Sequence, residues 1–300
     1  MTVPLTFVVG ADEDGRLDRL VARRFPDASR RKVVALIDDG AVRVDGHRGK
    51  KGERVRVGAT VVVTAAPVDD AALRVTADDD AAARLTMLHV DATRVVVAKP
   101  PGMPSQPLTA GERGTAAGGI VARFPECADA ARDPRDGGLV HRLDIGTSGV
   151  LIAARTRETW EALRASFSAG AVTKHYLALC EAPPVSRGCD APLVQRGARV
   201  VVDHTDGLDA TTTWEVIARA GERALVRCHA ETGRTHQIRV HLATCGAPIV
   251  GDTRYGGQPM PELVEFFLHA ERVRFDDLDL TAPLPPDRAA VLAALGITLA

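Results

Sequence analysis

Residues 141–154 read His141-Arg142-Leu143-Asp144-Ile145-Gly146-Thr147-Ser148-Gly149-Val150-Leu151-Ile152-Ala153-Ala154. The stretch begins as the densest polar cluster of the chain and ends as an apolar run of the kind that forms a buried strand. A polar loop next to such a strand keeps its side chains accessible while the strand fixes their position. The loop is therefore a candidate functional site. The alternative is that Asp144 only caps a turn and Arg142 only pairs with it.

A second polar cluster, residues 232–248, has the pattern of a turn, a helix and a stop. Thr235 is a suitable N-cap, and Gly246 with Pro248 can end the helix. The apolar face of the predicted helix consists of Ile238, His241, Leu242 and Cys245. Arg234 and Arg239 are then left for other contacts.

The histidines of this cluster do not have the spacing of a metal site. His236 and His241 are five residues apart, a poor spacing for two ligands on one helical face, and the segment lacks the glutamate of H-E-x-x-H. We predict no metal and no cofactor.

Two further segments carry candidate side chains. Residues 95–98 predict a short strand that ends at Lys99, before a loop rich in proline. Lys99 could approach a phosphate or a carboxylate, or could simply be exposed. Residues 173–178 predict another strand, in which Tyr176 is either an aromatic side chain at the edge of the core or a ring presented at a cleft.

The N-terminal region predicts two helices followed by short strands. Residues 16–25 have apolar side chains at helical spacing, and Ser29 can cap a second helix that ends near Gly40. The first turn of that helix carries Arg30, Arg31 and Lys32, although a helix N-terminus normally prefers acidic residues. An external phosphate would explain these cations. A solvated charged face is the alternative.

The whole chain constrains the class of protein. It has 300 residues, a formal charge of −1, 45% hydrophobic residues and five cysteines without a C-x-x-C pair. These values exclude a disordered or coiled-coil protein and disfavour a disulfide scaffold. The sequence lacks a secretory signal pattern and an apolar segment of 18 residues, so we expect a cytoplasmic protein with reduced thiols and no membrane partner.

The expected organisation has three parts. Residues 1–66 form a small α/β domain, residues 67–86, rich in Ala and Asp, form a linker, and residues 87–300 form an α+β domain with a mixed sheet. Within residues 16–56, 13 Lys and Arg face six Asp and Glu. Such a local basic excess is typical of nucleic-acid binding.

The N-terminal pattern resembles an S4 RNA-binding domain over roughly residues 15–66. The residues that carry this resemblance are Arg16-Leu17-Asp18, Ser29-Arg30-Arg31-Lys32, Ile37, Gly40 and Val42-Arg43-Val44-Asp45-Gly46. The resemblance implies that Arg30, Arg31 and Lys32 bind RNA.

The rest of the chain resembles the RluA-type pseudouridine synthases across residues 95–285. The motifs, in order, are Lys99-Pro100-Pro101-Gly102, His141-Arg142-Leu143-Asp144, Lys174-x-Tyr176-x-Ala178, Gly233 to His241 (G-R-T-H-Q-I-R-V-H), Gly251-Asp252-x-x-Tyr255-Gly256 and Leu268-His269-Ala270. The resemblance implies isomerisation of uridine to pseudouridine in RNA, without a cofactor. An S4-like module favours large-subunit ribosomal RNA as the substrate over transfer RNA, and nothing requires more than a monomer.

The resemblance also implies roles for individual residues. Breaking the glycosidic bond develops positive charge at C1′, so the reaction needs a carboxylate, and this role falls to Asp144. Arg234 is the implied ion-pair partner, although Arg239 is chemically equivalent. Arg142 would stack on bases beside the flipped nucleotide. Tyr176 would cover the extruded uracil and could also assist the loss of the proton from C5. Lys99 and Arg239 are further expected RNA contacts.

Two other functions fit parts of the pattern. A serine hydrolase could use Ser148, but the surrounding residues do not match G-x-S-x-G. A noncatalytic RNA-binding or ribosome-assembly protein would keep the fold and lose the reaction.

Overall fold

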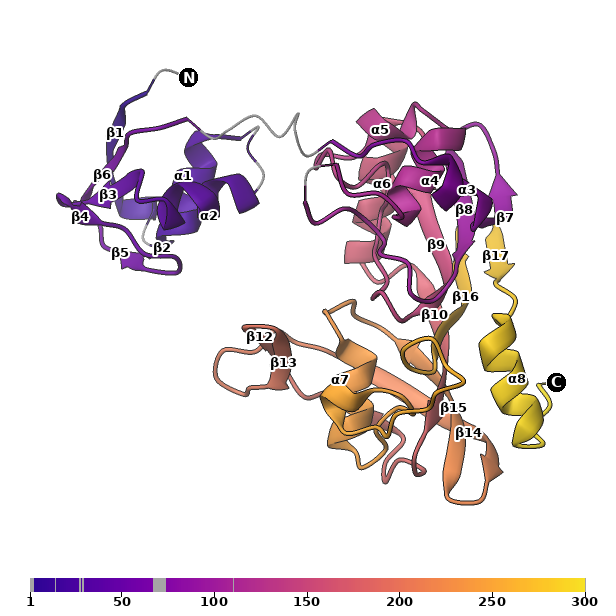
Figure 1. The fold of residues 1–300 in the computed structure, drawn as a ribbon. Helices are drawn as coiled ribbons and strands as arrows, with labels where there is room; N and C mark the ends of the chain where they lie inside the picture. Colours follow the sequence, from indigo (N-terminus) through magenta and orange to yellow (C-terminus); the bar gives the residue numbers. More distant parts are fainter. Residues whose placement is uncertain are drawn as a thin grey trace. The chain divides into compact units, whose positions relative to one another are not determined.

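The computed structural model describes residues 3–13, 15–26, 28, 30–66, 74–109 and 111–299, without the side chain of Arg31. Two compact units divide the chain, Met1–Ala72 and Leu73–Ala300. Figure 1 shows the helices and strands of each unit. The predicted cap Ser29 lies outside the described residues.

The N-terminal unit packs two helices against a small antiparallel sheet. Its helices are α1 (Leu17–Arg24) and α2 (Arg30–Asp38), after the 3-10 turn η1 (Ala11–Glu13). Its sheet has the order β1 (Leu5–Val8), β6 (Thr60–Val63), β3 (Val42–Val44) and β4 (His47–Arg48), and a separate pair joins β2 (Gly15–Arg16) to β5 (Arg54–Val55).

The core of this unit comes from the apolar positions that predicted its helices. Leu17, Leu20, Val33 and Ile37 are all buried in one cluster. The predicted Asp45-Gly46 turn connects β3 to β4. Both of its residues have positive φ angles, as a tight turn between twisted strands requires. The two predicted helices are therefore confirmed.

The second unit is built on a mixed sheet of nine strands. The order is β11 (Gly188–Cys189), β14 (Thr212–Ala220), β15 (Arg223–Ala230), β10 (Thr173–Cys180), β16 (Leu268–Phe275), β9 (Ser148–Ala154), β8 (Arg94–Lys99) and β7 (Thr86–Val90), with β17 (Leu278–Thr281) paired to β16. Only the β16–β9 pair among these is parallel. The predicted α+β class with a mixed sheet is confirmed.

Helices cover the sheet of the second unit. They are α3 (Asp79–Ala83), α4 (Ala116–Arg123), α5 (Cys127–Ala130), α6 (Arg157–Ser168), α7 (Gln237–Thr244) and α8 (Pro286–Ala294), with the 3-10 turn η3 (Thr253–Tyr255) and a hairpin of β12 (Leu193–Arg196) and β13 (Arg199–Val202). All of β9 is buried. Leu151 and Ala153 pack in the cluster of α4, whereas Val150 and Ile152 pack in the cluster of α6. This burial on both faces explains the unbroken apolar run after the 141–149 loop.

The predicted linker 67–86 is wrong at its C-terminal end, and residues 67–73 lie outside the described residues. Residues 74–86 belong to the second unit: Asp78 caps α3 through the Ala81 N–H, and Ala81 and Ala82 are buried. A Cβ on Gly119 would lie 2.8 Å from the Ala82 backbone nitrogen. Small side chains let α3 and α4 approach closely, and this packing leaves no periodic signal from large apolar residues.

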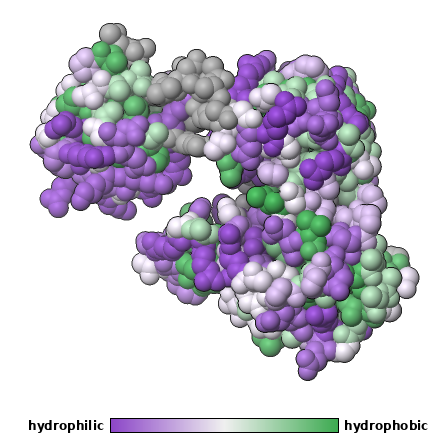
Figure 2. All heavy atoms as spheres, viewed as in Figure 1, coloured by the Kyte–Doolittle hydropathy of each residue, from purple (hydrophilic) through white to green (hydrophobic). Residues whose placement is uncertain are grey.

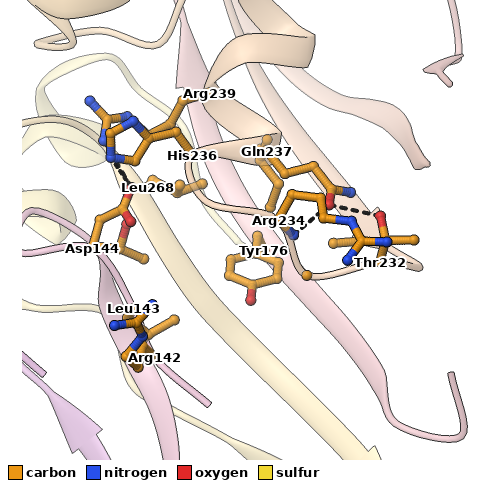
Figure 3. A pocket seen from close by; sticks show the side chains of 14 residues that line it. Arg142, Leu143, Asp144, Tyr176, Thr232, Arg234, His236, Gln237, Arg239 and Leu268 are labelled. Carbon is orange, nitrogen blue, oxygen red and sulfur yellow. Dashed lines mark hydrogen bonds and ion pairs between the residues drawn. The ribbon is translucent and has the colours of Figure 1, made fainter. Parts of the chain in front are cut away.

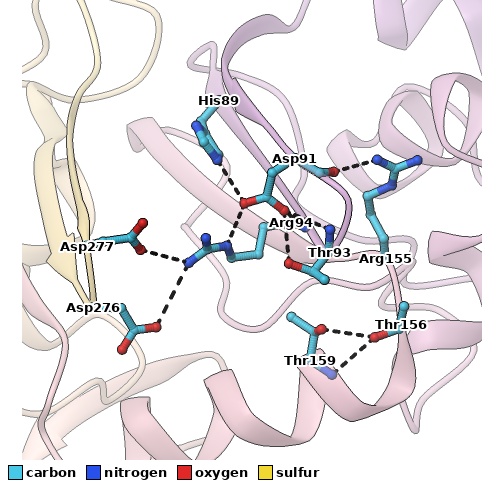
Figure 4. A network of polar contacts seen from close by, with 9 residues as sticks. All are labelled: His89, Asp91, Thr93, Arg94, Arg155, Thr156, Thr159, Asp276 and Asp277. Atoms are coloured by element: carbon cyan, nitrogen blue, oxygen red, sulfur yellow. Dashed lines mark hydrogen bonds and ion pairs between the residues drawn. The ribbon is translucent and has the colours of Figure 1, made fainter.

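A polar network secures the turn between β7 and β8, far along the chain from the 141–149 loop (Figure 4). Asp91 accepts hydrogen bonds from Thr93 and Arg94 and contacts His89, while Arg94 reaches Asp277 at 3.5 Å. Burial raises the pKa of Asp91, but these hydrogen bonds outweigh it and hold the pKa well below its ordinary value. The partners lie in β7, in β8, in the turn between these strands and in the turn between β16 and β17, so we interpret the network as structural.

Candidate active site

A pocket of the second unit contains the side chains singled out by the motifs (Figure 3). Its side chains come from the 141–149 loop, from β10 and β16, and from the segment that leads from β15 into α7. The lining residues are Arg142, Leu143, Asp144, Thr147, Tyr176, Ala230, Thr232, Gly233, Arg234, His236, Gln237, Ile238, Arg239 and Leu268. Motifs more than 90 residues apart in the chain therefore meet at one site.

Asp144 forms an ion pair with Arg239. The Nη1 of Arg239 donates to Oδ2 of Asp144 at 2.8 Å, and its Nε and Nη2 donate to the carboxylate of Asp252 at 2.6 and 2.9 Å. The exposed fraction of the side chain is 26% for Asp144, 6% for Arg239 and 1% for Asp252. Asp252 thus holds the guanidinium from behind, and Asp144 is the carboxylate that faces the pocket.

The surroundings of Arg239 keep it charged and fix its orientation. Burial alone would lower its pKa, but the hydrogen bonds and charges of Asp252 and Asp144 raise the pKa above its ordinary value. The guanidinium lies 4.2 Å from the ring centroid of Phe266 and 5.1 Å from that of Tyr255. Aromatic faces stabilise a cation at these distances.

His236 is a second neighbour of Asp144 for which the sequence predicted no role. It is the N-cap of α7 and has a φ of 53°, and its Nε2 lies 3.8 Å from Oδ2 of Asp144. The Tyr255 hydroxyl accepts from the Val200 N–H at 3.0 Å and lies 2.7 Å from Nδ1 of His236. Donating its proton to Nδ1 completes the bonding of this hydroxyl and leaves the Nε2 proton facing Asp144.

The protonation of His236 follows from its burial. Burial lowers the pKa of His236, and the charge of Asp144 acts in the opposite direction without restoring the ordinary value. A neutral imidazole is therefore the resting form. The quoted motif Gly251-Asp252-x-x-Tyr255-Gly256 contained both supporting residues, Asp252 and Tyr255. Its spacing alone did not indicate which side chains they contact.

The expected ion pair between Arg234 and Asp144 is wrong. Arg234 is exposed and donates its Nε proton to the Asp209 carbonyl at 2.9 Å. It precedes α7, whereas Arg239 lies inside the helix on the face that packs towards Asp252. The sequence allowed either arginine to be the ion-pair partner of Asp144, and only the geometry of the helix distinguishes them.

The expected RNA contact of Lys99 is also wrong. Lys99 is 1% exposed, and its Nζ donates to the carbonyls of Pro100, Met103 and Ile145 at 3.0, 2.7 and 3.2 Å. Burial lowers its pKa to about 7. The lysine holds the backbone of the loop beside Asp144 and does not reach solvent.

The remaining pocket residues differ in exposure. Tyr176, partly buried on β10, lines the pocket, and burial together with the charge of Asp144 raises its pKa above its ordinary value. The phenol therefore stays protonated, which disfavours a role as a base. Arg142 is exposed at the pocket, and its guanidinium makes no hydrogen bond or ion pair within the described part of the chain.

The geometry does not favour a serine hydrolase. Ser148 is fully buried, and its hydroxyl lies 2.8 Å from Nδ1 of His269, whose Nε2 lies 3.1 Å from the carbonyl of Ala282. Among the described residues no carboxylate hydrogen-bonds to that histidine, and Ser148 does not line the pocket. The pair instead joins β9 to β16.

The cations at the start of α2 are partly engaged within the N-terminal unit. Arg30, whose side chain is 68% exposed, donates to the buried Asp18 at 3.0 Å, and Arg16 donates to the same carboxylate. Lys32 is on the same helix, and the side chain of Arg31 lies outside the described residues. Arg30 therefore supports the fold as well as the surface charge.

Further exposed cations follow α2 in the chain. They are Arg43, Arg48, Lys50, Lys51, Arg54 and Arg56. Figure 2 shows hydrophilic residues crowded on one side of the N-terminal unit. The surface of this unit is suited to a polyanion.

The fold and the site together define an enzyme that acts on a nucleic acid, with a paired carboxylate in a pocket beside an aromatic ring. The family model for RNA pseudouridylate synthase matches residues 93–244, and that for the S4 domain matches residues 15–61. The chain belongs to the RNA pseudouridylate synthase family and is an RNA pseudouridine synthase with an N-terminal S4 domain.

Relatives agree over nearly the whole chain. "Ribosomal large subunit pseudouridine synthase D" of Xanthomonas campestris is 34% identical over 93% of this chain and 88% of its own. The protein of the same name from Pseudomonas aeruginosa is 34% identical over 93% of this chain and 92% of its own.

A solved structure has the same fold. "Human RNA Pseudouridylate Synthase Domain Containing 4" matches with a TM-score of 0.58 at 22% identity, over 71% of this chain and 94% of that one.

Two searches of the described residues complete the account. They contain no helix both long enough and apolar enough to cross a membrane. Among these same residues, no cluster of three or more His, Cys, Asp or Glu has the arrangement of a metal site.

Proposed function

We propose that the protein converts uridine to pseudouridine in large-subunit ribosomal RNA, with Asp144 as the catalytic carboxylate. The observation that carries the catalytic assignment is the Asp144–Arg239–Asp252 arrangement, in which one carboxylate is held at the pocket by a buried arginine. The names of the two bacterial relatives and the S4 domain support the ribosomal substrate.

The reaction conserves all atoms of the nucleotide. The bond from C1′ to N1 of the base breaks, the uracil turns, and a bond forms from C1′ to C5. The proton on C5 is lost and N1 gains one, so the product is an isomer and no cofactor is consumed. Positive charge develops at C1′, and the carboxylate of Asp144 stabilises it.

A uridine stacked in RNA reaches Asp144 only after it has flipped out of the stack, at a cost of a few kcal/mol. Arg142 is exposed beside Asp144, so its guanidinium stacks on the neighbouring bases and contacts phosphate. Tyr176 covers the flipped ring. Its raised pKa favours this stacking role over proton abstraction.

The remaining residues orient Asp144. Arg239 and His236 approach its carboxylate, and Lys99 holds the carbonyl of Ile145. Other arginines bind the RNA instead of orienting Asp144. Arg234 is exposed at the pocket, contacts the RNA and does not pair with Asp144. Arg30, Arg31 and Lys32 bind phosphates of the RNA.

We propose that the protein is a monomer and is located in the cytoplasm. An S4 domain within residues 1–66 binds RNA, and a catalytic domain begins near residue 74. These boundaries follow the two compact units and the burial of residues 74–86.

The proposal is tested by mapping pseudouridines in ribosomal and transfer RNA from cells with and without the gene. We expect one or more large-subunit positions to lose pseudouridine in the deletion strain and to regain it with the wild-type gene but not with Asp144→Asn. Loss confined to transfer RNA would overturn the substrate. An unchanged map, together with RNA binding by the purified protein, would favour a noncatalytic assembly protein.

A further inference from the structure

Arg288, near the end of the chain, is among the most deeply buried side chains of the protein. It lies on α8 and is 0% exposed. Its Nη2 donates to the carbonyls of Gly146 and Phe266 at 2.6 and 2.7 Å, and its Nη1 donates to Asp287 at 2.9 Å. It does not line the pocket, so it makes no contact with a bound nucleotide.

Burying a guanidinium carries a large desolvation penalty in free energy. Burial lowers the pKa of Arg288 below its ordinary value, and its Nε has no hydrogen-bond partner in the described structure. An apolar side chain of similar volume would normally stabilise such a position as well or better. The two backbone acceptors therefore call for an explanation beyond packing.

Both acceptors belong to segments that hold the Asp144–Arg239 pair. Gly146 is two residues after Asp144 in the same loop, and the ring of Phe266 lies 4.2 Å from the guanidinium carbon of Arg239. The two segments are also in direct contact, because a Cβ on Gly146 would lie 2.7 Å from Cε1 of Phe266. The Nη2 of Arg288 thus links the backbone of the loop that carries Asp144 to the backbone of Phe266, whose ring packs on Arg239.

Two other carbonyls of the loop are held by side chains from different elements. Ser105 donates to the Leu143 carbonyl at 2.7 Å, and Lys99 holds that of Ile145. Among the described side chains, Arg288 is the one that donates hydrogen bonds to a backbone carbonyl of the loop and to a backbone carbonyl of the segment that precedes β16. It lies outside the part of the chain that matches the synthase model, residues 93–244.

We propose that Arg288 is a positioning residue that sets the distance between Asp144 and Arg239 by joining the carbonyls of Gly146 and Phe266. The inference rests on the proposed catalytic role of Asp144. Helix α8 is then part of the catalytic apparatus. Without the two hydrogen bonds of Arg288, the carboxylate of Asp144 can shift relative to the sugar. A shift of about 1 Å can lower the rate about a hundredfold.

The test compares Arg288→Met, Arg288→Lys and the wild type under single-turnover conditions on a transcript that the wild type modifies. We expect Arg288→Met to lower the rate about a hundredfold. Arg288→Lys keeps the charge and donates to fewer acceptors, so we expect it to lower the rate about tenfold. The RNA dissociation constant should stay within about twofold for both, because Arg288 does not line the pocket.

Arg272→Met is the matched control, since Arg272 is an exposed arginine on β16 whose partner is Asp279. It should keep the wild-type rate. Circular dichroism and a thermal melt report the folded fraction of each variant. A rate that falls only in proportion to that fraction, or a weakened RNA affinity at an unchanged rate, would overturn the proposal.

Should Arg288→Met not fold, the lysine variant decides alone. A tenfold lower rate at an unchanged dissociation constant supports the positioning role, and a wild-type rate refutes it. Failure of the underlying function is distinct, because then Asp144→Asn would be as active as the wild type.

Discussion

Arginines serve the two units of this protein in opposite ways. In the N-terminal unit Arg30 is 68% exposed and holds a buried aspartate with one edge of its guanidinium. In the second unit Arg239 is 6% exposed and lies between two carboxylates and two aromatic rings. The exposed arginine keeps donors for a phosphate and is screened by salt, whereas the buried one has a single geometry and little contact with ions.

This contrast assigns different tasks to the two regions. Binding of a long polyanion needs many weak contacts that adjust to its shape, and exposed side chains provide them. Stabilisation of charge at one sugar carbon needs a carboxylate in one place, and buried partners provide that. Substitutions of Asp144 and its buried partners should therefore change the rate, and substitutions on α2 should change the affinity.

The largest expected effect is that of Asp144→Asn. The amide keeps the shape of the side chain but removes the negative charge, so we expect the rate of pseudouridine formation to fall at least about a thousandfold. Because Arg239 retains Asp252 as a partner, stability and RNA affinity should change little. Single-turnover assays and a binding titration measure both. Undiminished activity would remove Asp144 from the mechanism.

The second prediction compares two arginines of one segment. Arg239→Met leaves Asp252 buried and unpaired, so we expect the free energy of unfolding to fall by about 3 kcal/mol and the rate to fall about a hundredfold. Arg234→Met is the matched control. Arg234 is exposed, and its guanidinium donates to the Asp209 carbonyl, so we expect the free energy of unfolding to fall by less than about 0.5 kcal/mol and the rate to change little.

Urea unfolding and single-turnover rates distinguish the two variants. The reverse order, with Arg234→Met the more damaging to the rate, would restore Arg234 as the partner of Asp144 when RNA is bound.

A smaller effect is expected in the N-terminal unit. Arg30→Gln combined with Arg31→Gln removes two of the proposed phosphate contacts, so we expect about tenfold weaker RNA binding and a salt slope lower by about two. The single-turnover rate at saturating protein should equal that of the wild type. Titrations at several salt concentrations measure the slope, and a thermal melt corrects for loss of the Arg30–Asp18 contact.

The matched control replaces Arg272 and Arg274, two exposed arginines of the second unit, by Gln. An equal loss of salt dependence in this control would mean that the N-terminal unit is not the main contact with RNA.

The smallest effect concerns Lys99 and pH. Its pKa in the folded protein is about 7, against an ordinary value of 10.5, so between these values the unfolded chain binds more protons than the folded one. The contribution of Lys99 to stability therefore rises with pH from about 7 to about 10. The difference in free energy of unfolding between the wild type and Lys99→Met should grow in favour of the wild type over this range. Urea unfolding at several pH values tests this, and a constant difference would contradict a depressed pKa.

Local patterns in the sequence were sufficient for much of the fold. The two helices of the N-terminal unit followed from apolar spacing, and the buried strand β9 followed from an uninterrupted apolar run. The linker was predicted too long because α3 packs through small alanines against the glycines of α4. Alanine contributes little to hydrophobic periodicity, even where it is fully buried.

The candidate site was likewise predicted in part from local sequence patterns. Asp144, Tyr176 and Arg142 were recognised from their motifs, and all three line the pocket. Lys99 was misjudged because a lysine at a strand end is usually exposed, and only the neighbouring loops reveal that three carbonyls surround it. His236 lay inside a recognised motif that did not reveal its role, and Arg288 had no signal, since the partners of both lie at distant positions of the chain.

The order of residues along the chain was enough to identify the class of enzyme and the RNA-binding module, and to propose Asp144 as the catalytic carboxylate. These features are carried by short contiguous motifs that resemble, in order, the motifs of two known families. The choice of Arg239 over Arg234, the burial of Lys99 and the contact of Arg288 with the 141–149 loop depended on how strands and helices pack. Hydrogen bonds and ion pairs act over a few ångströms in space, and separation along the chain does not reveal which groups come that close.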